Sequence, residues 1–133
     1  TDWRIGIAHP LRPGQRLREL TLNNVAVSTS DSQKQFFRHG GRRYSHLIDP
    51  RTGQPAEGVL SATVLAPTAT LAELLSTAFF VLGAEKTADY CSHHPEISAV
   101  LAIPPDNVPD LSFGTLERSG EWCTVEFNMP TEP

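Results

Sequence analysis

Hydroxyl groups gather at the end of an apolar segment early in the chain. Ser28, Thr29, Ser30 and Asp31 directly follow the apolar residues 25–27. Hydroxyls and main-chain N–H groups that leave a strand can hold a phosphate group. The same side chains can instead complete a turn through hydrogen bonds to the local backbone, which is their commoner use. These residues alone leave a phosphate site and a turn as alternatives.

A histidine and a charged turn form the second cluster. His46 stands three residues before Asp49, which opens the turn sequence Asp-Pro-Arg-Thr-Gly of residues 49–53. An imidazole can transfer a proton near neutral pH, and an arginine can hold a phosphate group through two parallel hydrogen bonds. The alternative is a core histidine bonded to a main-chain carbonyl, with Asp49 serving only to form the turn.

The third cluster is a carboxylate and a hydroxyl on a predicted helix. Glu73 and Thr77 are four residues apart, which places them on the same side of a helix, one turn from each other. Oxygen ligands of this kind suit Mg²⁺, which is often held by one or two carboxylates together with phosphate oxygens of a substrate. Thr70 and Glu73 also have the spacing of a capping box, in which Glu73 would only stabilise the helix start. The spacing by itself favours capping over metal binding.

Apolar patterns predict the elements that must position these clusters. We expect helices over about residues 71–82, with Gly83 as the cap, and over about residues 85–93. Strands are expected at 3–7, 17–22, 25–30, 44–48, 61–66 and 98–103, followed by a hairpin of 113–118 with 122–127. Many strands with two central helices predict an α+β fold, a mostly antiparallel sheet packed with those helices.

Two of these elements have a predicted face. In strand 44–48, alternation places Tyr44, His46 and Ile48 on one side. Spacings of three and four predict one broad apolar face on the first helix, formed by Leu71, Leu74, Leu75, Ala78 and Leu82.

Composition limits the class of protein. The chain has 133 residues, 39% of them apolar, which fits one globular domain over residues 1–133. Eleven basic and fifteen acidic residues give a formal charge of −4, which argues against a nucleic-acid-binding module. The longest purely apolar run, residues 78–82, is far shorter than the ~20 residues of a membrane-spanning helix, so no transmembrane segment is expected. Cys91 and Cys123 do not make a disulfide framework or a zinc site.

Taken together and in this order, the clusters resemble the C-terminal half of a known enzyme family. Five segments carry the resemblance: 3–10 (WRIGIAHP), 25–30 (VAVSTS), 44–55 (YSHLIDPRTGQP), 63–66 (TVLA) and 71–83 (LAELLSTAFFVLG). They are similar to motifs of the FAD:protein FMN transferases, the ApbE family, once called thiamine-biosynthesis lipoproteins. The resemblance covers residues 3 to about 103, and it is most specific between His46 and Pro55.

The resemblance implies a fold and a reaction. The chain would form a half of the T-fold type and would bind FAD and Mg²⁺. It would transfer FMN through a phosphoester bond to a Thr or Ser hydroxyl of a target flavoprotein, with release of AMP, whereas some family members hydrolyse FAD to FMN and AMP. The resemblance also implies a periplasmic or membrane-anchored protein.

Site residues follow from the resemblance by position. His46 would be the catalytic histidine, and Glu73 and Thr77 would be the metal ligands. Thr29 and Ser30 would line the nucleotide pocket, and Asp49 would shape it.

Departures from the family pattern leave other functions open. Glu73 is one methylene longer than the family's aspartate, and Mg²⁺ demands tight octahedral geometry. Asp31 replaces a glycine and adds a negative charge beside the expected anion site. The alternatives are a diverged, non-catalytic module that binds flavin or a partner, and a structural fragment with no function of its own.

The family's N-terminal half has no counterpart in this sequence. That half supplies most of the flavin and adenine contacts, so activity would require it from the rest of a longer chain or from another copy. Because the sequence begins with a threonine and its only methionine is Met129, we expect a processed product or the C-terminal part of a longer protein.

Glu73→Asp tests whether this position is a metal ligand. The substitution restores the carboxylate length that the family uses, so it should tighten Mg²⁺ binding. The dissociation constant for Mg²⁺, measured by isothermal titration calorimetry on both proteins, checks this. An unchanged constant would contradict metal binding by Glu73.

Overall fold

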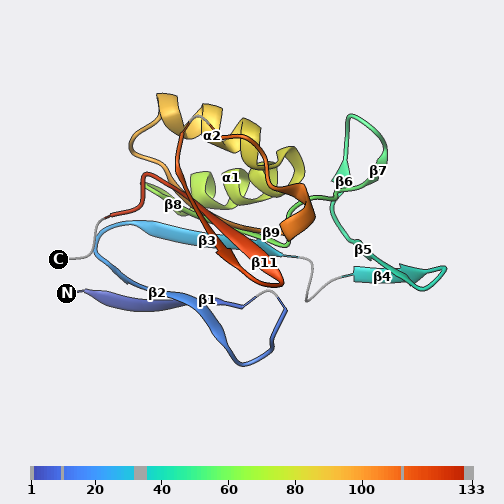
Figure 1. The fold of residues 1–133 in the computed structure, drawn as a ribbon. Coiled ribbons are helices and arrows are strands. Elements are labelled where there is room, and N and C mark those ends of the chain that lie inside the picture. The colour runs from blue at the N-terminus through green and yellow to red at the C-terminus, as the bar shows by residue number, and fades with distance from the viewer. Residues whose placement is uncertain (1, 10, 32–35, 112, 131–133) are drawn as a thin grey trace.

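A five-stranded antiparallel sheet forms the centre of the computed structural model, which describes residues 2–9, 11–31, 36–111 and 113–130 (Figure 1). Its strands lie in the order β10-β11-β9-β8-β3. Their bounds are β3 (Ala26–Asp31), β8 (Ser61–Ala66), β9 (Ser98–Ile103), β10 (Thr115–Ser119) and β11 (Trp122–Phe127). Every pairing within this sheet is antiparallel, and β3 and β10 are its two edges.

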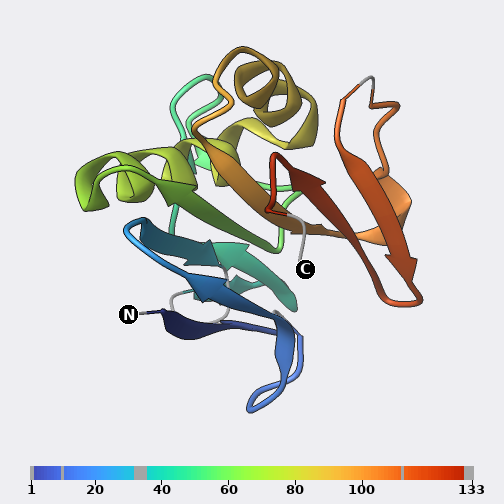
Figure 2. The same ribbon diagram turned by 90° about the vertical axis from the view of Figure 1, so that its left-hand side faces the viewer.

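Two helices cover one face of the sheet. They are α1 (Ala69–Leu82) and α2 (Ala84–His93), and Figure 2 shows both on the same side of the strands. The core between the layers has Phe79 and Phe80 on the helix side, with neither side chain more than 1% exposed. Its largest members from the sheet are Val64, Leu101, Ile103, Val125 and Phe127.

A two-stranded hairpin, β1 (Trp3–Ala8) with β2 (Arg16–Leu22), packs on the opposite face of the sheet (Figure 2). Ile7, Leu20 and Leu22 form a second core there with Leu65 and Val100. Strands β8 and β9 are thus covered from both sides, and all of their residues are buried. This explains why 61–66 and 98–103 read as almost continuous apolar runs rather than alternating ones.

Short hairpins fill the stretch between β3 and β8. They pair β4 (Phe36–His39) with β5 (Arg42–Ser45), and β6 (Ile48–Asp49) with β7 (Gln54–Pro55). The predicted strand 44–48 is wrong, because β5 ends at Ser45, whose hydroxyl accepts a hydrogen bond from the Leu47 N–H at 3.0 Å. This local bond bends the chain at His46, so Tyr44, His46 and Ile48 do not share one strand face.

Helix α1 starts earlier than the sequence predicts. Its N-cap is Thr68, whose side chain accepts a hydrogen bond from the Leu71 N–H at 3.2 Å. Thr70 therefore lies inside the helix, and the predicted capping box of Thr70 with Glu73 is wrong. At the other end, the predicted cap is confirmed: Gly83 has φ 91° and its N–H donates to the Phe79 carbonyl at 3.0 Å.

The predicted apolar face of α1 is wrong in part. Leu75 is buried, but Leu74 is 64% exposed and Leu82 is 38% exposed. The buried face consists of Ala72, Leu75, Ser76, Phe79 and Phe80. Phe79 and Phe80 have larger apolar side chains than Leu74 and Leu82. The helix is therefore rotated so that the two phenylalanines face the core and the two leucines do not.

The predicted fold class is confirmed: a mostly antiparallel sheet packs with two helices. Cys91 and Cys123 are both buried and free, and burial raises the pKa of the Cys91 thiol to about 12. Within the described ranges, neither α1 nor α2 is long and apolar enough to cross a membrane.

A buried histidine fixes the loop between β1 and β2. His9 is 7% exposed, and its Nδ1 accepts hydrogen bonds from the Leu11 and Arg12 N–H groups, both at 3.1 Å. Its ring meets Trp122 edge to face, with 4.3 Å between the centroids. Burial and the nearby Arg12 guanidinium lower the pKa of His9, whereas Glu121 acts in the opposite direction. The folded protein therefore favours the neutral form of this ring over the protonated one.

Stability should decrease as His9 becomes protonated. Because the pKa is lower in the folded than in the unfolded chain, the stabilisation is complete above the unfolded pKa of about 6.5 and is lost as the pH falls from there through the folded pKa. The melting temperature of the wild type, followed from pH 8 to pH 5 by circular dichroism, should drop by several degrees. His9→Asn, which keeps an acceptor for the loop but does not titrate, should give a flatter profile. Parallel profiles for the two proteins would contradict this role.

Candidate functional site

One pocket gathers most of the predicted site residues. It has a volume of about 510 Å³ and lies where the edge strand β3, helix α1 and the bend at His46 come together. Its lining residues are Gly6, Ala8, Ser28, Thr29, Ser30, Asp31, His46, Leu47, Glu73 and Thr77. We call it the β3–α1 pocket. It contains all the predicted site residues except Asp49.

The hydroxyl groups of β3 bond to neighbouring elements rather than forming a turn. Ser30 Oγ lies 3.0 Å from Ser76 Oγ and 3.3 Å from Thr77 Oγ1 on α1. On the other face of the strand, Thr29 Oγ1 lies 2.9 Å from Thr63 Oγ1, its direct partner in β8. The turn interpretation of this cluster is therefore wrong, because the residues continue a strand whose two faces meet different layers.

Glu73 and Thr77 lie on the side of α1 next to β3. Glu73 is exposed and Thr77 is partly buried, and both line the β3–α1 pocket. Because the helix starts at Ala69, Glu73 belongs to its second turn and does not cap its beginning. Helix capping therefore does not explain why a carboxylate stands at position 73. The hypothesis that Glu73 is a metal ligand remains a prediction.

His46 is on the surface of the molecule and not in the core. It follows β5 at the bend and is exposed, which excludes the core-histidine alternative. The next residue, Leu47, packs against the main core, and its carbonyl accepts the Ala56 N–H at 2.8 Å. These contacts of Leu47 fix the chain directly after His46. The His46 imidazole lines the β3–α1 pocket.

Asp49 is not brought to the β3–α1 pocket. Its carboxylate accepts two hydrogen bonds from the Arg51 side chain, at 3.0 and 2.8 Å, and one from the Arg51 N–H at 2.9 Å. These bonds hold the pKa of the Asp49 carboxyl below its ordinary value. The Arg51 guanidinium also lies 3.4 Å from the Val81 carbonyl, which ties the turn to the end of α1. The predicted part of Asp49 in shaping a nucleotide pocket thus remains a prediction.

Oxygen donors and negative charge dominate the β3–α1 pocket. Asp31 and Glu73 supply carboxylates, and the serines and threonines supply hydroxyls. Among the described residues that line it, none is a lysine or arginine. No group of three or more His, Cys, Asp or Glu side chains in the described ranges could hold a metal by itself. The donor set nevertheless fits Mg²⁺, which takes one or two carboxylates and completes its shell with water or phosphate oxygens.

Sequence reasoning missed Ser76, a side chain of α1 that contacts two strand hydroxyls. It is 0% exposed and lies on the buried face of α1. Ser76 is the one hydroxyl among the buried residues of α1, whose other members are Ala72, Leu75, Phe79 and Phe80. The sequence could not show this pattern, because it predicted a different buried face for the helix.

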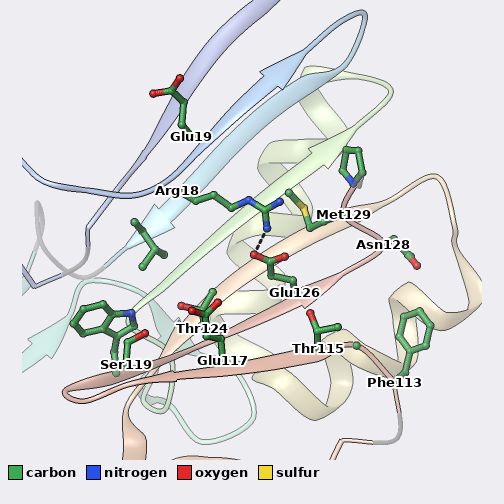
Figure 3. A pocket seen from close by; sticks show the side chains of 14 residues that line it. Arg18, Glu19, Phe113, Thr115, Glu117, Ser119, Thr124, Glu126, Asn128 and Met129 are labelled. Atoms are coloured by element: carbon green, nitrogen blue, oxygen red, sulfur yellow. Dashed lines mark hydrogen bonds and ion pairs between the residues drawn. The ribbon is translucent and has the colours of Figure 1, made fainter. Parts of the chain in front are cut away.

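A larger pocket of about 950 Å³ lies between β2 and the β10–β11 hairpin (Figure 3). Arg18 of β2 and Glu126 of β11 both line this pocket, and they form an ion pair that connects the hairpin of β1 and β2 to the central sheet. Trp122, Thr124 and Met129 contribute to its walls. None of the predicted site residues lines it. The predicted site residues therefore gather in the β3–α1 pocket, apart from Asp49.

Comparison with known sequences identifies one family. The sequence profile described as "ApbE family" matches residues 1–101. The chain is 39% identical over 108 residues to a "FAD:protein FMN transferase" of Haemophilus influenzae, an alignment covering 79% of this chain and 31% of that protein. It is also 39% identical over 119 residues to a protein of the same name from Treponema pallidum, covering 88% of this chain and 33% of that one.

Solved structures agree with this. The ApbE protein of Thermotoga maritima superposes with a TM-score of 0.70 at 33% identity, covering 84% of this chain and 36% of that one. The flavinyl transferase ApbE of Pseudomonas stutzeri, in its apo form, superposes with a TM-score of 0.66 at 27% identity, covering 98% of this chain and 38% of that one. The chain spans about a third of the length of these relatives.

Asp49→Asn tests the ion pair that holds the turn after His46. The asparagine keeps the turn geometry but removes the charge, so at pH 7 the melting temperature should fall by several degrees. The stability that the paired Asp49 carboxylate contributes to the folded protein is complete above the pKa of an aspartate in the unfolded chain. This stability is lost as the pH falls through the lowered pKa of Asp49 in the folded protein.

The difference in melting temperature between the wild type and Asp49→Asn should consequently shrink as the pH falls through that lowered pKa, because a protonated Asp49 is as uncharged as the asparagine. Asp110→Asn, at an exposed aspartate, serves as the control and should change little at either pH. A constant difference across this range would contradict a charge-dependent role for Asp49.

Proposed function

The chain belongs to the ApbE family, and from this membership and the chemistry of the β3–α1 pocket we propose that it carries part of the active site of a Mg²⁺-dependent FAD:protein FMN transferase. The supporting observation is that His46, Glu73 and Thr77, separated in sequence, line one pocket together with the β3 hydroxyls. The substrates are FAD and an acceptor flavoprotein with a Thr or Ser attachment site.

The proposed reaction exchanges the phosphoanhydride bond of FAD for a phosphoester bond to the acceptor. The acceptor hydroxyl oxygen forms a bond to the phosphorus of the FMN half, and the bond from that phosphorus to the bridging oxygen of the diphosphate breaks. AMP leaves with the electron pair of that bond. His46 accepts the proton of the attacking hydroxyl at a ring nitrogen, which an exposed imidazole can do near neutral pH. With water in place of the hydroxyl, the same exchange would hydrolyse FAD to FMN and AMP.

The charge of the pocket supports a requirement for a divalent cation. A diphosphate that enters beside Asp31 and Glu73 meets like charges, and the described lining offers no cationic side chain to offset them. Glu73 and Thr77 would hold the cation through oxygen atoms one helical turn apart. When bound, Mg²⁺ would neutralise charge on the diphosphate as the bond breaks.

The remaining predicted residues have positioning roles in this proposal. Thr29 and Ser30 would contact the nucleotide from the edge of the sheet, where their hydroxyls are already held by Thr63 and by α1. Asp49 would shape the pocket from outside it, by bracing the turn that follows the bend at His46. Since the chain spans about a third of its relatives, further walls of the flavin site would come from other segments of a longer chain or from another copy.

A second candidate function is that of a diverged flavin-binding or interaction module without catalysis. Two observations favour it: Glu73 stands where the family has an aspartate, and Asp31 adds a carboxylate to the pocket wall. Such a module would bind FAD weakly or independently of Mg²⁺ and would not transfer FMN.

His46→Ala distinguishes these functions. The chain is mixed with FAD, MgCl₂ and an acceptor flavoprotein, and covalent flavin on the acceptor is followed by in-gel fluorescence. Loss of the proton acceptor should reduce transfer by about 10²–10⁴-fold. The melting temperature should change little, because the imidazole is exposed.

The matched control is His93→Ala, which removes an exposed histidine at the end of α2. It should leave transfer and stability unchanged. Wild-type transfer that survives His46→Ala would contradict the catalytic role. FAD binding without any transfer, even with MgCl₂ and with the further segments of a longer chain supplied, would favour the non-catalytic module.

A further inference from the structure

A buried serine on α1 connects the hydroxyl groups of the β3–α1 pocket. Ser76 is 0% exposed, and its hydroxyl lies 3.0 Å from that of Ser30 and 3.3 Å from that of Ser28. It also donates to the main-chain carbonyl of Glu73 at 3.0 Å. One side chain thus joins both strand serines to the helical turn that carries the Glu73 carboxylate.

The number of available protons sets the direction of each of these hydrogen bonds. A carbonyl oxygen can only accept, so the single hydroxyl proton of Ser76 is used on Glu73. In the contacts of Ser76 with Ser28 and Ser30 either hydroxyl can donate, and with the Ser76 proton placed on Glu73 the two strand serines are the donors, one to each of its lone pairs. Because the proton of Ser30 is used there, Thr77 is the donor in its 3.3 Å contact with Ser30.

This order of donors turns oxygen lone pairs toward the pocket. Thr77 and Ser30 both line it, and each uses its only proton inside the network. Lone pairs beside a carboxylate suit a hard cation, whereas a phosphate group is bound by hydrogen-bond donors. We propose that Ser76 is a positioning residue that holds Thr77 and Ser30 with their lone pairs free to ligate a divalent cation beside Glu73. The inference rests on the proposed function, because it adds Ser76 to the cation site described there and makes Ser30, placed there beside the nucleotide, a further oxygen ligand.

Other buried hydroxyls in the chain behave differently. Ser98 is 9% exposed and donates to the Asn128 carbonyl at 2.7 Å. Thr87 is 0% exposed and donates to the Gly83 carbonyl at 2.7 Å. Among the hydrogen bonds of the described residues, neither accepts one from another side chain, whereas Ser76 accepts two. Ser98 therefore provides a matched control in which only the bond to the main chain is lost.

The experiment measures Mg²⁺ and FAD affinities separately. Wild type, Ser76→Ala and Ser98→Ala, each as the full 133-residue chain, are titrated with MgCl₂ with and without FAD, and with FAD without metal, by isothermal titration calorimetry. Removing a side chain that orients metal ligands costs about 10–100-fold in metal affinity, so Ser76→Ala should weaken Mg²⁺ binding at least tenfold. Its affinity for FAD without metal should not fall, because the freed serine protons can donate to phosphate oxygens. Ser98→Ala should match the wild type in every titration.

A second variant guards against loss of folding. Ser76→Cys nearly preserves the side-chain volume, but sulfur is a weak hydrogen-bond acceptor, so it should weaken Mg²⁺ binding like the alanine variant. Wild-type Mg²⁺ affinity in either Ser76 variant would overturn the inference and leave the proposed function standing. Equal loss of Mg²⁺ and metal-free FAD binding would also overturn it, since that pattern indicates general distortion of the pocket. A wild-type chain that binds FAD but no Mg²⁺ would overturn it together with the cation requirement, while the flavin part of the proposed function would stand.

Discussion

The packing of α1 against β3 and β8 is the contact on which the site depends. Phe79 and Phe80 are buried almost completely in the core beneath the helix, and each contributes roughly 1.5–3 kcal/mol through burial. Their positions set the rotation of α1 about its axis. That rotation turns Glu73 and Thr77 toward the edge strand and places Ser76 under it. An apolar interaction thus positions a polar site.

Strand β3 supplies hydroxyls to the β3–α1 pocket from the edge of the sheet. A central strand would have a neighbour on each side, as β8 has with β3 and β9. At the edge, Ser28 and Ser30 reach α1 on one face, and Thr29 reaches Thr63 on the other. The second layer, formed by β1 and β2, brings Gly6 and Ala8 to the same opening. Two sheets and a helix therefore meet where the chemistry is concentrated.

The metal-ligand hypothesis for Glu73 and its capping alternative depended on where the helix begins, which spacing could not decide. Thr68 and Thr70 are both acceptable N-caps by residue type. In the structure Thr68 caps the helix, which adds two residues at its start and leaves Glu73 in the second turn. The strand predicted at 44–48 failed for a related reason: the Ser45 hydroxyl bonds to the local backbone and bends the chain, a competition that alternation of apolar residues does not reveal.

Residue types and spacing were sufficient for the α+β class, the strand segments of the sheet, the Gly83 cap and the turn at residues 49–53, because these follow from local conformational preferences and from apolar periodicity. They were also sufficient to choose His46, Glu73 and Thr77 as candidates. Packing alone decided which of the candidates meet. It rotated α1 onto its phenylalanines and buried Ser76 among the pocket hydroxyls, whereas Asp49 bonds locally to Arg51, two residues further along the turn. Contacts between residues far apart in sequence depend on how whole layers fit together, and no local pattern encodes that fit.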